Sequence, residues 1–130
     1  MILDSSAVMA VLREEPGHDV LLDRIAADAR PGIGAPTLVE TAIVLTARLG
    51  ATARTALARF LQEAEAAVLP FEDDHWPVAL DAFERFGKGR HPAGLNLGDC
   101  LTYATARLAQ EPLLAVGGDF AQTDLEVVLR

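Results

Sequence analysis

The sequence predicts an α/β fold in which a central, mostly parallel sheet of four or five short strands is flanked by helices in a three-layer arrangement. Short apolar runs alternate with stretches of helical periodicity, and this alternation is typical of repeated β-α-β units. It continues along the chain without a Gly/Ser-rich linker or an internal repeat. Because 130 residues is also the usual length of one domain, we expect a single domain over residues 1–130.

The first half of the chain predicts two strands and four helices. The strands are short apolar runs at 2–3 and 33–35. The helices have apolar residues three or four positions apart, and we expect them at 7–14, about 20–29, 36–49 and 52–66. Pro36 and Gly50 are the residue types preferred at the first and last positions of a helix, which supports the bounds of the third helix.

The second half predicts three strands and two helices. The strands are apolar runs at 67–71, 113–116 and 126–129. One helix starts near Asp73-Asp74 and ends at Phe86, and the other covers 96–109. Residues 88–95 between them, with two glycines and one proline, are expected to form a loop.

Composition and charge exclude several classes of protein. The chain is 51% apolar and 23% charged, as in folded globular proteins. Nineteen acidic against eleven basic residues give a net charge of −8, which argues against binding nucleic acid through overall charge but leaves room for local basic loops. A single cysteine excludes an intramolecular disulfide and a cysteine-based zinc site. The longest apolar run, 7–12, is too short to span a bilayer, and we expect no membrane contact and a cytoplasmic location.

Four acidic residues are expected at one edge of the sheet. Asp4 directly follows the first strand, and Asp119 follows the strand at 113–116 after a Gly-Gly turn. Glu40 and Asp99 lie in the first turns of two predicted helices. Carboxyl ends of parallel strands share an edge, and ligands bind there. Four carboxylates would repel one another unless a divalent cation neutralised them, and oxygen ligands favour Mg²⁺, with Mn²⁺ as the alternative.

Each of these acids also has a structural interpretation. Thr37-x-x-Glu40 and Asn96-x-x-Asp99 have the spacing of a capping box, in which the acid bonds to a backbone N–H at the helix start. Asp4 can cap the first helix and Asp119 can serve as a turn residue. These interpretations explain each acid separately, but they do not explain why all four are expected at the same edge.

Four motifs of the chain occur together in a known family. They are Ile2-Leu3-Asp4-Ser5-Ser6-Ala7, a helical Glu40, the block GKGRHPAGLNLGDC at 87–100, and GGDFAQTD at 117–124. In this order they resemble PIN-domain ribonucleases, and more narrowly the VapC toxins of bacterial type II toxin–antitoxin pairs. The resemblance extends over the whole chain. Gly118 stands where the family often has asparagine, a difference that affects the turn and leaves Asp119 in place.

The resemblance implies a Mg²⁺-dependent endoribonuclease that cuts RNA and is neutralised by a VapB antitoxin, and it favours a homodimer. By resemblance, Asp4 and Asp99 are the principal metal ligands, and Glu40 and Asp119 are the third and fourth acids. Ser6 matches a hydroxyl that orients the first aspartate. We hypothesise that these acids are also the catalytic set, with attack of water leaving a 5′-phosphate.

Four basic or potentially basic residues precede Asp99: Arg85, Lys88, Arg90 and His91. They are interpreted either as a solvated loop or as contacts for RNA phosphates, and the sequence leaves both open. Three further side chains have structural interpretations. Cys100 is expected to be a buried thiol and Asp124 a cap for the last segment, while Trp76, Phe83 and Phe86 are expected in the core or an interface.

Two alternative functions stay open at this stage. One is a Mg²⁺-binding phosphoacceptor module of receiver type, which also gathers acids at strand ends. Such a module normally needs paired acids after the first strand and a lysine near the end, whereas Asp4 stands alone and Lys88 is the only lysine. The other alternative is a degenerate PIN protein that binds its antitoxin without cutting RNA.

Overall fold

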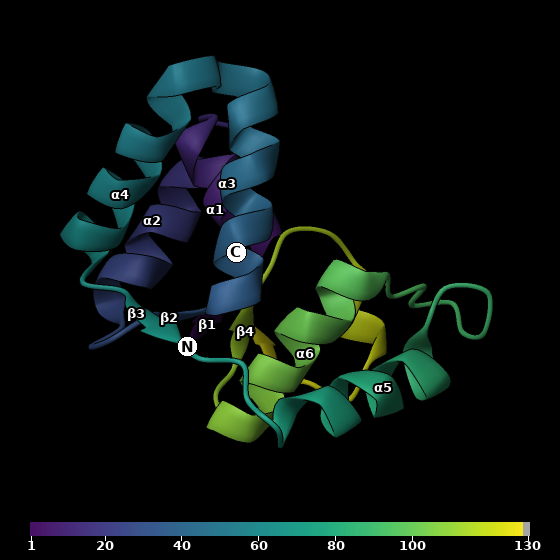
Figure 1. Ribbon diagram of the computed structural model, residues 1–130. Coiled ribbons are helices and arrows are strands. Elements are labelled where there is room, and N and C mark those ends of the chain that lie inside the picture. The colour runs from purple at the N-terminus through teal and green to yellow at the C-terminus, as the bar shows by residue number, and fades with distance from the viewer. Residues whose placement is uncertain (129–130) are drawn as a thin grey trace.

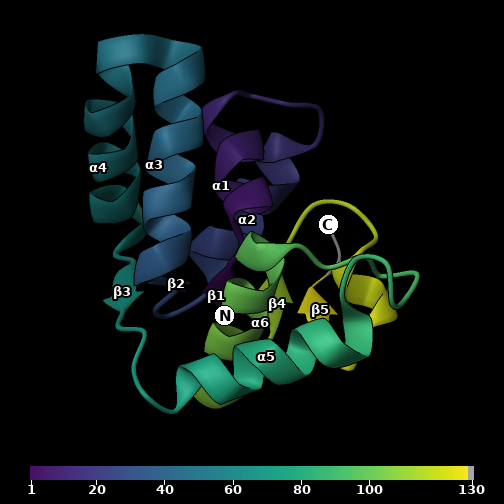
Figure 2. The ribbon, with the colours of Figure 1, turned by 45° about the vertical axis from the view of Figure 1, so that its right-hand side comes forward.

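The computed structural model describes residues 1–128 and shows three layers, with a parallel sheet between two groups of helices (Figures 1 and 2). The sheet has the strand order β3-β2-β1-β4-β5, and each pair of neighbours is parallel. Helices α1 to α4 cover one face, and α5 and α6 cover the other. The strands are β1 (Ile2–Leu3), β2 (Gly32–Gly34), β3 (Ala67–Leu69), β4 (Leu113–Leu114) and β5 (Val127–Val128).

The expected helices are confirmed, with shifts of a few residues at their ends. They are α1 (Ser5–Leu12), α2 (His18–Ala27), α3 (Ala35–Leu49), α4 (Ala53–Ala64), α5 (His75–Phe86) and α6 (Leu97–Ala109), with short 3₁₀ helices η1 (Gly50–Thr52) and η2 (Phe120–Gln122). Helix α1 starts two residues before the expected Ala7 because its N-cap is Asp4, whose side chain accepts from the Ser6 N–H. Strand β1 has the expected bounds, β2 is shifted by one residue, and β3 and β4 are each two residues shorter than expected. Strand β5 begins one residue later than expected, and Leu129, its expected end, lies outside the described residues.

Alternating strand residues supply two separate cores. Leu3, Ile33 and Leu114 pack with the helices on the α1–α4 side. Ile2 and Leu113 point the other way, into the core formed with α5 and α6. Successive side chains of a strand face opposite sides of a sheet. A sheet buried on both faces therefore requires continuous apolar strands, which is the pattern that the sequence showed.

The strand order excludes the receiver-type alternative. In receiver domains the strand order is 2-1-3-4-5, so the first strand lies between the second and the third. Here β1 lies between β2 and β4, with β3 and β5 at the edges. No described helix is long and apolar enough to cross a membrane.

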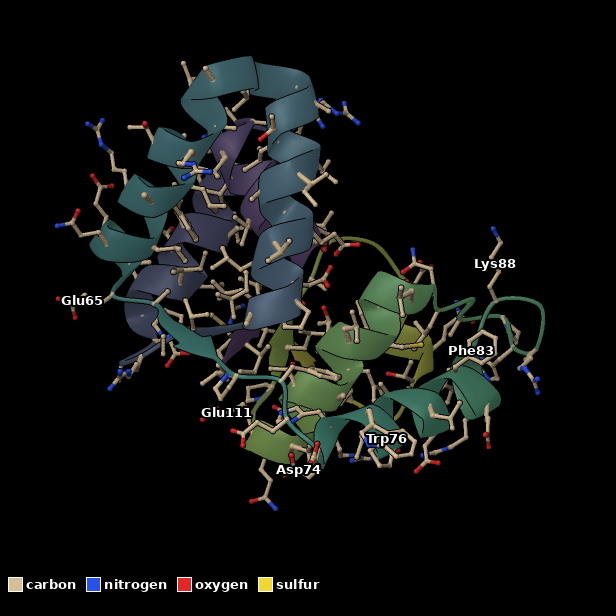
Figure 3. All side chains as sticks on the ribbon, in the orientation of Figure 1. Glu65, Asp74, Trp76, Phe83, Lys88 and Glu111 are labelled. Carbon is tan, nitrogen blue, oxygen red and sulfur yellow. The ribbon has the colours of Figure 1, made fainter. Side chains whose placement is uncertain are left out.

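The three aromatic side chains expected in the core or an interface differ in their exposure. Phe86 is buried, as expected, but Phe83 and Trp76 are 37% and 60% exposed and project outward from α5 (Figure 3). They therefore do not belong to the core. Helix α5 packs mainly on α6, and side chains on its other faces reach solvent.

Candidate functional site

Asp4 is held at the carboxyl end of β1. Its backbone N–H donates to the carbonyl of Leu114 on β4 at 3.0 Å. Its side chain is 4% exposed, and Oδ2 accepts hydrogen bonds from the Ser6 backbone N–H at 3.1 Å and from Ser6 Oγ at 2.6 Å. Ser6 Oγ accepts in turn from the Val116 N–H at 2.9 Å. Asp4 is thus a helix cap, and Ser6 fixes its carboxylate against the segment that follows β4.

Asp99 lies in the first turn of α6 and completes a capping box. Asn96 Oδ1 accepts from the Asp99 N–H at 2.9 Å, and Asp99 Oδ2 accepts from the Asn96 N–H at 3.1 Å. A hydrogen bond of this kind favours the ionised carboxylate and lowers its pKa. Nevertheless, burial raises the pKa of Asp99 to about 6, and the negative charges of Asp4, Asp119 and Glu40 add to the increase. Capping therefore does not account for the surroundings of this carboxylate.

Glu40 does not have the capping role that its spacing from Thr37 allows. Helix α3 begins at Ala35, so Thr37 already lies within the helix, where it is buried and shares a 3.0 Å hydrogen bond with Thr102 Oγ1. The carboxylate of Glu40 instead lies against Gly98, because a methyl group built on Gly98 would be 2.2 Å from Glu40 Oε2. Glu40 therefore reaches the start of α6 beside Asp99.

Asp119 is the exposed member of the group. It follows Gly117, whose φ of +98° favours glycine, and Gly118, and it immediately precedes η2. Its side chain makes no cap hydrogen bond to η2. Its negative charge contributes to the raised pKa of Asp99, as do the charges of Asp4 and Glu40, so Asp119 lies near enough to act on the same carboxylate.

The chain thus brings four carboxylates from distant positions around the start of α6. As they are placed, no three acidic, histidine or cysteine side chains within residues 1–128 form a group close enough to hold an ion. The chemistry of the donors nevertheless fits Mg²⁺ or Mn²⁺, since all are carboxylate oxygens and a divalent cation would relieve the penalty on ionised Asp99.

Gly98 is a site residue that the sequence reasoning missed. Glycine is unfavourable inside a helix, so its position directly before Asp99 was the available signal. We expect Gly98→Ala to keep the fold, because the group it displaces is the end of a flexible side chain. Displacing the Glu40 carboxylate should lower RNA cleavage about as much as Glu40→Gln, measured as initial rates. Full activity in Gly98→Ala would show that cleavage does not require the Glu40 carboxylate at its position beside Gly98.

The basic residues before Asp99 have different surroundings. Arg85 donates to Asp124 at 3.2 Å, and His91 Nδ1 accepts from the Ala93 N–H at 3.0 Å. Arg90 lies over the exposed Phe83 ring at 5.2 Å, and Lys88 extends from the loop (Figure 3). Arg85, Lys88 and Arg90 are all exposed. The charge of Arg85 is paired with Asp124, whereas no acidic group within residues 1–128 pairs with Lys88 or Arg90.

Cys100, next to Asp99, has the expected environment of an inert thiol. It is 3% exposed, and burial together with the charge of Asp99 raises its pKa. A protonated, inaccessible thiol is a poor nucleophile.

Comparison with known proteins identifies the family. A model of the PIN domain matches residues 1–126. The chain belongs to the PIN-domain family. Its relatives include VapC ribonuclease Mb2004c of Mycobacterium bovis and ribonuclease VapC36 of Mycobacterium tuberculosis, each 51% identical over 97% of this chain and 91% of the relative. Ribonuclease VapC of Mycolicibacterium smegmatis is 38% identical over 98% of this chain and 99% of the relative.

Solved structures share the same PIN fold. VapC20 of Mycobacterium tuberculosis, described as a sarcin-ricin loop cleaving toxin, aligns with a TM-score of 0.80 at 20% identity, over 99% of this chain and 98% of that chain. VapBC2 of Rickettsia felis, bound to a DNA fragment from its promoter, aligns with a TM-score of 0.75 at 13% identity, over 98% and 96%. At these identities the likeness confirms the fold, while the curated relatives place the chain among the VapC ribonucleases.

Proposed function

We propose that this VapC ribonuclease is the toxic component of a type II toxin–antitoxin pair and cuts RNA endonucleolytically with a divalent cation. The observation that carries the proposal is the position of Asp99. Its half-buried carboxylate lies beside the Glu40 carboxylate at Gly98, and the charges of Asp4, Glu40 and Asp119 all act on it. Capping a helix does not require other acidic side chains nearby. Relatives named VapC ribonuclease over nearly the whole chain support the reaction class.

Each acidic residue has a distinct part in the proposed centre. Asp4 and Asp99 are the principal ligands, because both are anchored by hydrogen bonds before any ion binds. Glu40, whose carboxylate lies against Gly98, is the third acid, and the exposed Asp119 is the fourth. When bound, Mg²⁺ or Mn²⁺ would supply charge neutralisation, a lowered pKa for a water molecule and polarisation of the phosphodiester. Ser6 keeps the Asp4 carboxylate in place through its 2.6 Å hydrogen bond.

RNA contacts are part of the proposal at the loop before α6. Among Arg85, Lys88, Arg90 and His91, Lys88 and Arg90 are the stronger candidates, since their charges are not paired with an acid among the described residues. The charge of Arg85 is paired with Asp124, and His91 accepts a backbone hydrogen bond. Such contacts would hold phosphates without reading sequence, and they would make binding weaker as salt rises.

The test of the proposed function is metal-dependent cleavage. Protein freed of its antitoxin is incubated with labelled RNA and Mg²⁺ or Mn²⁺, then with EDTA, then with excess metal. We expect cutting that stops with EDTA and returns with metal. Cleavage that continues unchanged in EDTA would contradict the metal centre. Absence of cleavage and of toxicity on expression would favour the alternative, a protein that only binds its antitoxin.

A VapB-type antitoxin is the proposed partner, in line with structural neighbours described as toxin–antitoxin complexes. An acidic pocket attracts a cationic side chain, so we expect the antitoxin to insert arginine or lysine among the carboxylates. Replacing these antitoxin residues with glutamine should restore RNA cleavage in the assembled complex. Co-purification of the two proteins is the control that the antitoxin still binds. Continued inhibition by the bound variant would show that the site is blocked in another way.

A homodimer acting in the cytoplasm completes the proposal. Val39, Ile43 and Leu97 are 58%, 66% and 76% exposed. They line a groove of about 340 Å³ that also contacts Glu40 and Gly98, and a second copy would cover them. The apolar residues Leu57, Phe60 and Leu61 of α4 pack in the core on the α1–α4 side and are not available for such a contact. An RNA substrate and a single buried cysteine support a cytoplasmic location.

A further inference from the structure

Asp124 is the centre of a polar cluster that the proposed metal centre does not use. Its Oδ1 accepts a 2.7 Å hydrogen bond from the hydroxyl of Tyr103, which is 2% exposed. Its Oδ2 accepts from Arg85 at 3.2 Å and from Arg107. Arg107 also donates to the Tyr103 hydroxyl at 3.3 Å. The cluster joins the segment after η2 to both α5 and α6.

These contacts exclude two simpler roles for Asp124. It does not cap the last segment, because its hydrogen bonds go to side chains on α5 and α6 rather than to nearby backbone. Its charge is already balanced by two guanidinium groups, so it is a poor ligand for a cation. The earlier expectation of a cap is therefore wrong, and the cluster needs another explanation.

The cluster is on the same face of α6 as Asp99. Tyr103 and Arg107 follow Asp99 by four and eight residues, and residues four apart lie above one another on a helix. The segment 119–124 lies along this face. Phe120 packs in the same core as Cys100 and Tyr103, Asp124 bonds to Tyr103 and Arg107, and the charge of Asp119 acts on Asp99. The segment therefore runs along the helix that carries the principal ligand.

The chain before Asp119 is also fixed in place. The Val116 N–H donates to Ser6 Oγ, which in turn bonds to Asp4. Between these attachments lie the exposed Gly117 and Gly118, and then Phe120, which is 4% exposed in the core with α5 and α6. The two glycines are the part of the segment with the greatest backbone freedom. Beyond Asp119 the chain is held first by Phe120 and then by Asp124, so both residues limit how far this freedom reaches the Asp119 carboxylate.

We propose that Asp124, held by Tyr103, Arg107 and Arg85, is a positioning residue that sets Asp119 against Asp99. The proposal rests on the proposed metal centre, since it assigns Asp124 a task at that centre without contact to metal or RNA. Outer residues that orient ligands typically contribute about 10-fold to 100-fold in metal affinity or activity. Asp124 acts through the intervening backbone, so we expect an effect at the low end of this range.

The test compares Asp124→Ala and Tyr103→Phe with the wild-type protein. Hydrogen exchange of amides 117–123 should be faster in both variants, and Mn²⁺ binding measured by electron paramagnetic resonance should weaken, about 10-fold in Asp124→Ala and less in Tyr103→Phe. The kcat for RNA cleavage should fall in parallel with an unchanged KM. In an Asp119→Asn background, Asp124→Ala should leave Mn²⁺ affinity unchanged. Arg13→Met, which removes an exposed ion pair with Glu15, is the control expected to change none of these.

The outcomes separate this inference from the proposed function. Wild-type protein that does not bind Mn²⁺ would overturn the metal centre, and the positioning role with it. If the wild type binds Mn²⁺ but exchange and affinity are unchanged in both variants, the positioning role alone is overturned. An equal loss of affinity with and without Asp119 would also overturn it, because the effect would then not pass through that carboxylate. If Asp124→Ala fails to fold, hydrogen exchange and Mn²⁺ affinity of Tyr103→Phe test the positioning role instead. That variant removes one hydroxyl and keeps the ring.

Discussion

Asparagine in place of Asp4 or Asp99 is expected to lower the rate of RNA cleavage at least about 100-fold while the fold is retained. Asparagine has nearly the same shape as aspartate, and its side-chain oxygen can still accept from Ser6 at position 4 or from the Asn96 N–H at position 99. The negative charge that attracts a divalent cation is lost. Initial rates on labelled RNA, with circular dichroism to check folding, measure the effect.

The matched control is Asp81→Asn, which removes an exposed carboxylate from α5. It changes the net charge by the same amount and should cut RNA at the wild-type rate. Loss of activity in all three variants would reflect overall charge rather than the site. Activity retained in both Asp4→Asn and Asp99→Asn would contradict the mechanism.

The same Asp99→Asn variant is expected to be more stable than the wild type in the absence of metal. In the folded protein the pKa of Asp99 is raised from 3.8 to about 6, so ionisation of this carboxyl opposes folding. Solvent screens the charge of this half-buried carboxyl, so its ionisation lowers the free energy of unfolding by on the order of 1 kcal/mol at neutral pH. The melting temperature of the variant in EDTA should therefore exceed that of the wild type by several degrees.

The difference in melting temperature between Asp99→Asn and the wild type depends on pH because the pKa of Asp99 is raised in the folded protein. Between pH 4 and 6 the folded state retains a proton on Asp99 that the unfolded chain releases, so the contribution of Asp99 to stability falls as pH rises. The difference in melting temperature should be smallest near pH 4 and largest above pH 7. Mg²⁺ should stabilise the wild type at pH 7.5 and have less effect on the variant. A variant less stable than the wild type at pH 7.5 without metal would contradict the assignment.

The fold followed from the sequence because a sheet covered on both faces leaves a simple pattern. Ile2 and Leu3 point into different cores, so both must be apolar. The meeting of Asp4 and Asp119 at one edge followed from the parallel strands that precede them. The ends of later strands were less predictable, since only Leu113 and Leu114 of the apolar run 113–116 belong to β4.

The roles of individual acids could not be read from spacing alone. Asp99 has the spacing of a capping box and forms one, yet it also lies among three other charges. Glu40 has the same spacing from Thr37 and forms none, because α3 already starts at Ala35 with Pro36 in its first turn. Which residue begins a helix depends on packing, and the spacing of two residues does not fix it.

Contacts between distant segments were the least predictable part. Asp124 bonds to Tyr103, 21 residues away, and to Arg85, 39 residues away. These contacts exist because α5, α6 and the last segment pack around one core. No local pattern in the sequence marks such a meeting, although the four-residue steps from Asp99 to Tyr103 and Arg107 place them on one helix face.

The most direct test of the metal centre is a crystal structure grown with Mn²⁺, in which the ion is located by its anomalous scattering. We expect a peak between the carboxylates of Asp4 and Asp99, within about 2.2 Å of an oxygen of each, with Glu40 or Asp119 drawn toward it. A peak elsewhere, or Asp4 and Asp99 pointing to different sides of the molecule, would contradict the account.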